Sequence, residues 1–166
     1  MARAGDLGAF EELVRDHQAD VYRLARRLVR DRPTAEDVTQ EAFIHAYRSL
    51  GRFRGGSKFS TWLFRITRNC AVDAIRRRER QRRRDQAAAP EPEAGGDPTL
   101  RASIDQAIEG LPAELREAFV LIEVIGLSYR EAGVVLGVLT GTLKSRMHRA
   151  RRLLVTALEE ADAGEV

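Results

Sequence analysis

Five side chains near the C-terminus have the chemistry and the spacing to contact DNA: Lys144, Ser145, His148, Arg149 and Arg152. Steps of three and four residues place them on one face of a helix. Arginine can contact guanine with two hydrogen bonds, serine can contact more than one base, and lysine or arginine can hold phosphate. The pattern favours a DNA-contacting helix, while a basic face that is only solvated stays open as the alternative.

A helix-turn-helix is the element that would present this face. Ser128 followed by Glu131 fits a capping box at a helix start, and Gly137 can adopt the left-handed conformation that ends a helix. Thr140 can cap the second helix. The apolar side of that second helix consists of Leu143, Met147, Ala150 and Leu154. One helix would brace the motif and the other would lie in the major groove.

Composition indicates a folded protein with a polyanionic partner. The chain has 166 residues with 43% hydrophobic content, which allows one domain or two small ones. Its 28 Lys and Arg exceed 25 Asp and Glu only slightly, but the cations are clustered. Cys70 is the only cysteine, which argues against a disulfide framework or a Cys-based zinc site. No signal peptide or membrane-spanning run is visible, so we expect a reducing cytoplasm.

The N-terminal half is predicted to be helical. Apolar residues at helical spacing from Leu7 to Leu28 indicate one long helix, or two with a hinge near His17. The sequence Asp31-Arg32-Pro33 is expected to break this pattern, and Thr34 to cap a second helix that ends at Gly51. The second helix carries an acidic and polar patch within a basic chain. This patch consists of Asp37, Gln40 and Glu41.

A third helix is predicted from Phe59 onward, with Trp62 and Ile66 on its core side. Cys70 continues that side and is interpreted as a small buried hydrophobe. Beyond Cys70, arginines occupy nearly every face, which favours contact with a phosphate backbone over a frayed, solvated end. These arginines are Arg76, Arg77, Arg78, Arg80, Arg82, Arg83 and Arg84.

Residues 86–99 are predicted to be a flexible linker, because they are rich in Pro, Gly, Ala and acids and lack large apolar residues. The linker separates a domain at 1–85 from one at 100–166. The second domain would begin with a helix to Leu111 and continue with the stripe Leu115, Phe119, Ile122 and Ile125. The tail after Ala157 is expected to fray. The predicted fold class is all-α: two small helical domains joined by a flexible linker, the second containing a helix-turn-helix.

Three segments together resemble the extracytoplasmic-function (ECF) group of bacterial sigma factors. They are AEDVTQEAFIHAYRSL, FRGGSKFSTWLFRITRNCAVDAIRRRERQ and LPAELREAFVLIEVIGLSYREAGVVLGVLTGTLKSRMHRARRLL. They cover most of the chain and follow the family's order, with the linker between them. The resemblance implies a dissociable subunit of bacterial RNA polymerase that directs the enzyme to promoters and helps to open the duplex. It implies no catalytic residues, no cofactor and no small-molecule substrate.

The resemblance also implies which residues make contact. Asp37, Gln40 and Glu41 match positions that dock on the clamp helices of the largest polymerase subunit. The positions that match the −10 contact segment are Phe53, Ser60, Trp62, Ile66, Asn69, Asp73, Arg76 and Arg77. The positions that match the −35 contact helix are Thr142, Lys144, Ser145, His148, Arg149 and Arg152.

Two of these positions have competing interpretations. Asn69 would offer an amide to base edges beside an aromatic and apolar stacking wall, but it could also be only solvated. For Trp62, the interpretation as a core residue is preferred to the interpretation as a platform for base stacking. The histidines His17, His45 and His148 are far apart in the sequence and show no ligand spacing, so no metal site is predicted.

The implied partners are core RNA polymerase, contacted at the clamp helices and the flap, promoter DNA, and an anti-sigma protein that covers the polymerase-binding surfaces. The protein itself would insert into no membrane. It would lie in the cytoplasm, associated with the nucleoid when active or sequestered by the anti-sigma partner.

Two alternatives stay open. The first is a free-standing helix-turn-helix regulator, which would not need the acidic patch. The second is a sigma-like protein that has lost promoter opening, against which Asn69 and Arg76 argue.

The chain departs from the family's pattern at two positions in the helix-turn-helix. Leu139 stands where many members have proline, and Gly133 stands where they often have alanine. Gly133 is expected to cost about 1 kcal/mol of helix stability relative to alanine, and it would permit a closer helix crossing.

Overall fold

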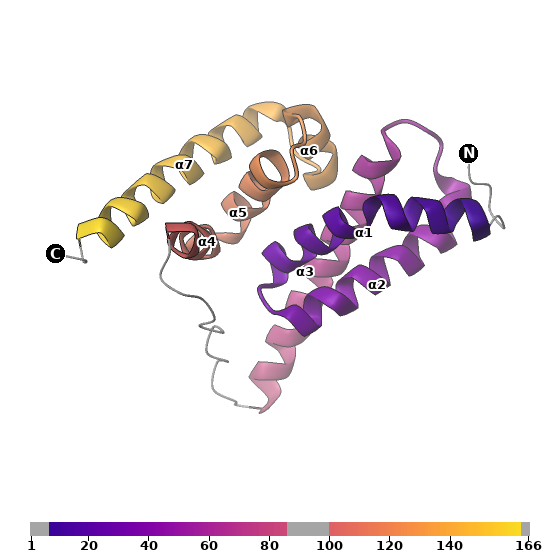
Figure 1. Ribbon diagram of the computed structural model, residues 1–166, viewed down its shortest axis with the longest axis horizontal. Helices are drawn as coiled ribbons and strands as arrows, with labels where there is room; N and C mark the ends of the chain where they lie inside the picture. Colours follow the sequence, from indigo (N-terminus) through magenta and orange to yellow (C-terminus); the bar gives the residue numbers. More distant parts are fainter. Residues whose placement is uncertain (1–6, 86–99, 164–166) are drawn as a thin grey trace. The chain divides into compact units, whose positions relative to one another are not determined.

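The computed structural model describes residues 7–85 and 100–163. Within these residues the chain is helical and contains no strand, as the sequence predicts. The helices form two compact units, the first from α1 to α3 and the second from α4 to α7 (Figure 1). The predicted linker, residues 86–99, lies outside the described residues. No helix of the described ranges combines the length and apolar character that crossing a membrane requires.

Three helices pack pairwise against one another in the first unit. They are α1 (Leu7–Val29), α2 (Arg32–Ser49) and α3 (Phe59–Asp85), with the short 3₁₀ turn η1 (Leu50–Arg52) after α2. The first helix is continuous, so there is no hinge near His17. Small side chains let the helices approach closely, because alanines of all three helices are fully buried. These are Ala25, Ala35, Ala42, Ala46 and Ala71.

The turn between α1 and α2 differs from the sequence prediction. Arg30 has a φ of 68°, the left-handed conformation that ends many helices. The next helix begins at Arg32, and its cap is Asp31, whose carboxylate accepts a hydrogen bond from the Thr34 N–H at 2.9 Å. Thr34 is therefore not the cap. Pro33 lies in the first turn, where the N–H that it lacks would have no partner within the helix.

The second unit is organised around a long C-terminal helix. Its elements are α4 (Leu100–Gly110), α5 (Ala113–Phe119), the π-helical turn η2 (Val120–Val124), α6 (Tyr129–Leu136) and α7 (Thr140–Ala163). Helices α4, α5 and α6 all pack against α7. Leu143, Met147 and Ala150 are fully buried, and Leu154, the fourth residue of the predicted apolar face of α7, is half-buried against the core. The helix continues to Ala163, so the acidic tail extends it further than expected.

A π-helical turn changes which residues after α5 face the core. The N–H of Ile125 donates to the carbonyl of Val120, five residues earlier, at 2.9 Å. Val120 and Leu121 are buried, whereas Ile122 and Ile125 are only half-buried. The predicted stripe is therefore correct at Leu115, but its last two members contribute less to the core than Val120 and Leu121.

A buried arginine holds the connection between α4 and α5. The Arg116 side chain donates from Nη1 to the carbonyls of Glu109 and Leu111, at 3.0 and 3.2 Å. These carbonyls lie at the end of α4, where backbone acceptors lack partners within the helix. Arg116 thus fixes α4 relative to α5, a role that the sequence pattern did not indicate.

Candidate nucleic-acid interface

The predicted helix-turn-helix is formed by α6 and α7. The Ser128 hydroxyl accepts from the Glu131 N–H at 3.1 Å, and the Glu131 carboxylate accepts from the Ser128 N–H at 2.8 Å. Gly137 ends α6 with φ 66° and ψ 34°. These contacts confirm the capping box and the left-handed glycine. Thr140 is the first residue of α7 rather than its cap.

Gly133 allows the backbone of the turn to approach α6. A Cβ atom at Gly133 would lie only 2.9 Å from the backbone oxygen of Val138 and 3.7 Å from Cδ1 of Leu143. The Val138 N–H donates to the Gly133 carbonyl at 3.1 Å, which ties the turn to the helix. The sequence led us to expect a closer helix crossing, but the close approach is to the backbone of the turn, and the nearest atom of α7 lies at ordinary contact distance.

The cations of α7 fall into two groups. Arg151 forms an ion pair of 2.7 Å with Glu123, and Arg146 lies 3.6 Å from Glu114. These two arginines brace α7 against η2 and α5. The residues predicted to contact the −35 element are instead all exposed: Thr142, Lys144, Ser145, His148, Arg149 and Arg152. Arg151 is exposed as well, so its ion pair with Glu123, rather than burial, distinguishes it from the predicted −35 residues.

Helix α3 presents a continuous stripe made of residues predicted to contact the −10 element. The steps of four and three residues put them on one side of the helix. Exposure rises along the stripe, because its first two members are half-buried and the other three are exposed. In order, they are Trp62, Ile66, Asn69, Asp73 and Arg76. The stripe is therefore partly apolar at Trp62 and Ile66 and becomes polar from Asn69 onward.

An aromatic cluster lies at the start of this stripe. The ring centroids of Phe53, Phe59 and Trp62 are 5.2 to 5.8 Å apart, and His17 of α1 lies 5.5 Å from Phe59. All four side chains are half-buried, so the cluster covers the core and also offers ring surface to solvent. Ser60 is half-buried beside it in the sequence. Sequence analysis did not associate His17 with this site, because only helix packing brings it there.

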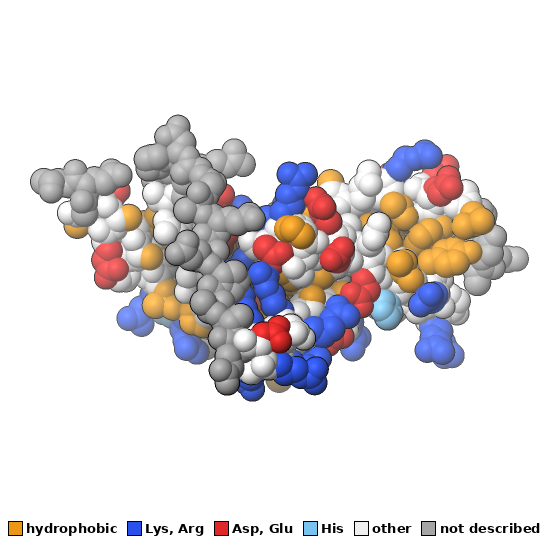
Figure 2. All heavy atoms as spheres, turned by 90° about the horizontal axis from the view of Figure 1, so that it is seen from below, with side chains coloured by type: hydrophobic (Ala, Val, Ile, Leu, Met, Phe, Trp, Pro, Cys, Tyr) orange, Lys and Arg blue, Asp and Glu red, His pale blue; other side chains and the backbone are white. Residues whose placement is uncertain are grey.

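Two ion pairs hold the basic part of α3 on α2. Arg77 Nη2 lies 3.1 Å from Glu41 Oε2, and Arg78 pairs with the cap residue Asp31. Burial acts to raise the pKa of Asp31, but hydrogen bonds from Thr34 and the charge of Arg78 outweigh it and keep the pKa below its ordinary value. The basic stretch is therefore partly structural. Figure 2 shows many Lys and Arg side chains gathered around the C-terminal part of α3.

The acidic patch on α2 lies beside exposed apolar side chains. Asp37 and Gln40 are exposed and Glu41 is half-buried. Ile44 and Tyr47, on the next turn, are 49% and 37% exposed. Tyr47 does contact Phe10, with ring centroids 5.0 Å apart. A polar surface with exposed large apolar residues is typical of a protein-binding face. The exposure of Ile44 beside the acidic patch was not expected from the sequence.

Cys70 is buried between α2 and α3, as predicted. Burial raises the pKa of its thiol to about 11, and the charges of Glu41 and Asp73 act in the same direction while Arg77 opposes them. The thiol is thus protonated near neutral pH and is a poor nucleophile.

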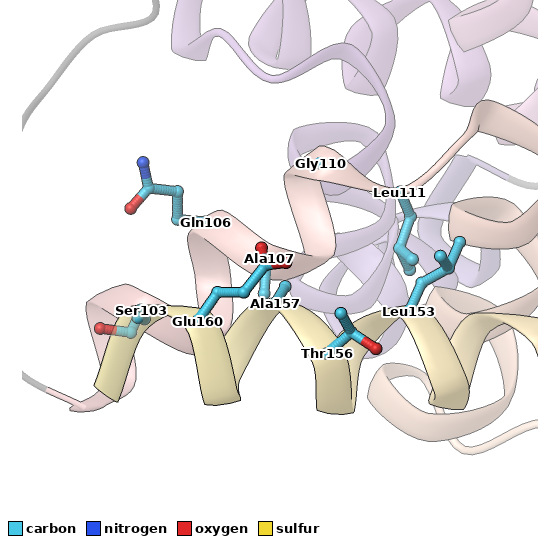
Figure 3. Close-up of a pocket in the computed structure, with 10 residues that line it drawn as sticks. Ser103, Gln106, Ala107, Gly110, Leu111, Leu153, Thr156, Ala157 and Glu160 are labelled. Atoms are coloured by element: carbon cyan, nitrogen blue, oxygen red, sulfur yellow. The ribbon is translucent and has the colours of Figure 1, made fainter. Parts of the chain in front are cut away.

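A groove of about 430 Å³ lies between α4 and α7 (Figure 3). Glu160 is the only ionisable side chain among the residues that line it. No histidine, cysteine or lysine lies among these residues, so the groove offers no hydroxyl–imidazole or thiol–imidazole pair for nucleophilic catalysis.

Comparison with known proteins identifies two matching family descriptions. Residues 13–81 match Sigma-70 region 2, and residues 101–154 match Sigma-70, region 4. The first stretch contains the acidic patch and the α3 stripe. The second contains the helix-turn-helix.

Individual relatives match across both stretches. The ECF RNA polymerase sigma factor SigE of Mycolicibacterium smegmatis is 44% identical over 155 residues, covering 88% of this chain and 60% of SigE. The RNA polymerase sigma-H factor of Pseudomonas aeruginosa is 39% identical, covering 93% of this chain and 89% of that factor. A solved structure of the sigma factor RpoE with the anti-sigma factor NepR from Bartonella quintana matches with a TM-score of 0.78 and 30% identity. That match covers 92% of this chain and 98% of RpoE.

Proposed function

Because the chain belongs to the extracytoplasmic-function group of RNA polymerase sigma factors, we propose that its two helical units divide promoter recognition between them. Residues 1–85 would bind core polymerase and the −10 element, and residues 100–166 would bind the −35 element. The observation that carries this division is that the first unit has an acidic face with exposed apolar residues on α2 and, on α3, a stripe that runs from aromatic and apolar to polar residues. The helix-turn-helix lies in the second unit.

Core polymerase would bind the face of α2. Asp37, Gln40 and Glu41 supply charge and hydrogen-bond acceptors, and the exposed Ile44 supplies apolar area. Such a combination gives both orientation and buried surface at a protein interface. We assign the clamp helices of the largest subunit as the partner on the basis of the family resemblance.

Single-stranded −10 DNA would bind the aromatic cluster and the stripe of α3. Bases stack well on exposed aromatic rings, which Phe53 and Trp62 offer in part. Asn69 follows on the same side of α3 and can donate to and accept from a base edge. Arg76, two turns further along, is exposed and suited to phosphate.

The −35 element would be read in the major groove by the exposed side of α7. Lys144, Ser145, His148 and Arg149 lie near the N-terminal part of this helix, which is the part that recognition helices usually insert. Arg151 is not in this set, because it is paired with Glu123.

An anti-sigma protein is a further proposed partner. The RpoE structure that resembles this chain was solved with such a protein bound. We also propose that the chain acts in the cytoplasm, where core polymerase is found, and that it performs no catalysis of its own. The free-standing regulator is not favoured, because that alternative does not account for the region 2 match.

The decisive experiment is run-off transcription with bacterial core RNA polymerase on genomic fragments of the source organism, followed by mapping of the start sites. The protein should initiate from specific sites only together with core enzyme, and should bind duplex DNA weakly by itself. Tight binding to a duplex operator without any association with core enzyme would contradict the proposal.

The docking face is tested by measuring association of the purified protein with core enzyme. The double variant Asp37→Arg with Gln40→Ala should weaken association with core enzyme, because it reverses one charge and removes one amide. Reversing another exposed acid of the first unit, Glu12→Arg, is the matched control and should have no effect. Unchanged association of the double variant would refute the docking assignment.

A further inference from the structure

Three potential metal ligands from two helices meet in the first unit. Glu41 and His45 are four residues apart on α2 and therefore share one side of that helix. Cys70 reaches the same place from α3. A carboxylate oxygen, an imidazole nitrogen and the Cys70 sulfur all lie within 4.8 Å of one another. The sequence predicted no metal site, because 25 residues separate His45 from Cys70 and only the packing of α3 on α2 joins them.

The donor set fits one class of ion. Sulfur, imidazole nitrogen and carboxylate oxygen are the ligands that Zn²⁺ uses, commonly three from the protein with water in a fourth position. Metal–ligand bonds of about 2.0–2.3 Å require the three atoms to draw closer than they now lie. His45 can make this adjustment, because its side chain is 57% exposed and can rotate freely. Cys70 is fixed in the core and provides the anchored ligand.

We propose that Glu41, His45 and Cys70 form a binding site for a divalent transition-metal ion of the zinc class. The site has an orienting contact of the kind that metal ligands usually have. Arg77 Nη2 lies 3.1 Å from Oε2 of Glu41, while Oε1 faces Nε2 of His45 at 3.8 Å. Glu41 can thus bind the ion through Oε1 and keep Arg77 on its other oxygen. The Cys70 thiol loses its proton to solvent when the ion binds.

Because of the position of the site, a bound metal ion should affect the binding of core polymerase. This part of the inference rests on the proposed function. Glu41 belongs to the face that we assign to core polymerase. A bound cation neutralises the Glu41 carboxylate and holds His45 next to Ile44 on that face. Metal binding and polymerase binding should therefore oppose each other, and by linkage each should weaken the other by the same factor.

The site itself is tested on the purified full-length chain without polymerase. Titration with Zn²⁺ should show one ion per chain. Titration with Co²⁺ in place of Zn²⁺ should produce a thiolate-to-metal charge-transfer band, which reports Cys70 as a ligand. His45→Ala, Glu41→Gln and Cys70→Ala should each weaken binding on the order of tenfold or more. The control His148→Ala removes an exposed histidine of the other unit and should leave affinity unchanged.

The behaviour of the His45→Ala variant and the Co²⁺ spectrum decide whether the metal site exists. His45→Ala removes an exposed side chain and should keep the fold, so it remains informative even if Cys70→Ala unfolds the core. Zn²⁺ affinity that is unchanged in His45→Ala, or a Co²⁺ complex without the charge-transfer band, would overturn the site.

The coupling is tested separately by measuring association with core enzyme at rising Zn²⁺ concentration. Wild type should lose affinity, whereas His45→Ala should not respond. One Zn²⁺ per chain with unchanged core affinity would refute the coupling and keep the site. Absence of core association without any Zn²⁺ would instead count against the proposed function.

Discussion

Single arginines serve two different purposes in this chain. Arg77, Arg78 and Arg151 form ion pairs with carboxylates of other elements. Arg149 and Arg152 lie exposed on the predicted DNA-contacting side of α7, although exposure alone does not set them apart, because Arg77 and Arg151 are exposed too. Exposed ion pairs contribute only about 0–1 kcal/mol to stability, so their main effect is to orient neighbouring helices. In the proposed function, Arg149 and Arg152 are the arginines that reach a base edge or a phosphate.

Contact with DNA and ion pairing within the protein predict different outcomes for the substitution of two arginines on α7. Arg149→Ala should relax sequence preference in the upstream promoter element by about 1–3 kcal/mol, because a bidentate base contact is lost. The measurement is binding of the polymerase holoenzyme to promoters that carry single substitutions in that element. An equal loss across all these sequences would mean that Arg149 holds only phosphate.

The matched control is Arg151→Ala. This variant removes the ion pair with Glu123 and should lower thermal stability slightly without changing sequence preference. A change in preference as large as that of Arg149→Ala would show that the ion pair does not keep Arg151 from DNA.

Among the elements, the helix-turn-helix depends on a close backbone approach. The turn after α6 brings the Val138 carbonyl against Gly133, where a Cβ would be 2.9 Å away. The close approach places α7 so that Leu143 and Met147 are buried and the opposite side faces out. Helix propensity alone would favour alanine at position 133, but the geometry of the turn opposes it.

Alanine substitution of two glycines distinguishes the effect of helix propensity from the effect of the close backbone contact at Gly133. Gly141→Ala, in the first turn of α7, meets no atom within 4 Å and should stabilise the protein by up to about 1 kcal/mol. Gly133→Ala should instead lower stability, because the Val138 backbone must move. Chemical denaturation of both variants provides the comparison. A gain in stability for Gly133→Ala equal to that of Gly141→Ala would show that the turn relaxes without cost.

The whole molecule consists of two helical units with separate cores. Leu24, Val38 and Leu63 are buried in the first, and Leu115 and Met147 in the second. In the proposed function this division suits a protein that binds two DNA elements, because the polymerase rather than a contact within the chain would set the distance between them.

Separate cores predict that the units fold independently. Fragments 1–85 and 100–166 should each be helical, and their circular dichroism spectra should sum to that of the full chain. Each fragment is small, so its stability should be only a few kcal/mol. A fragment that remains unfolded alone would show that one unit requires the other.

Features that depend on near neighbours in the chain could be predicted from the sequence. The capping box of Ser128 and Glu131, the helix end at Gly137 and the buried side of α7 were all predictable. Each arises from hydrogen bonds or helical periodicity within a few residues. The family resemblance was predictable for the same reason, since it rests on continuous segments. The cap at Asp31 was missed because both Asp31 and Thr34 are suitable cap residues.

Contacts between charged and polar side chains of different helices could not be predicted from the sequence, because they depend on how the helices pack. Helix packing pairs Arg77 with Glu41, brings His17 to Phe59, and joins Cys70 to His45 and Glu41. These contacts link helices that are distant in the sequence, so they depend on helix packing rather than on local spacing. The same packing gives Arg77 and Arg151 their carboxylate partners, which local spacing does not indicate.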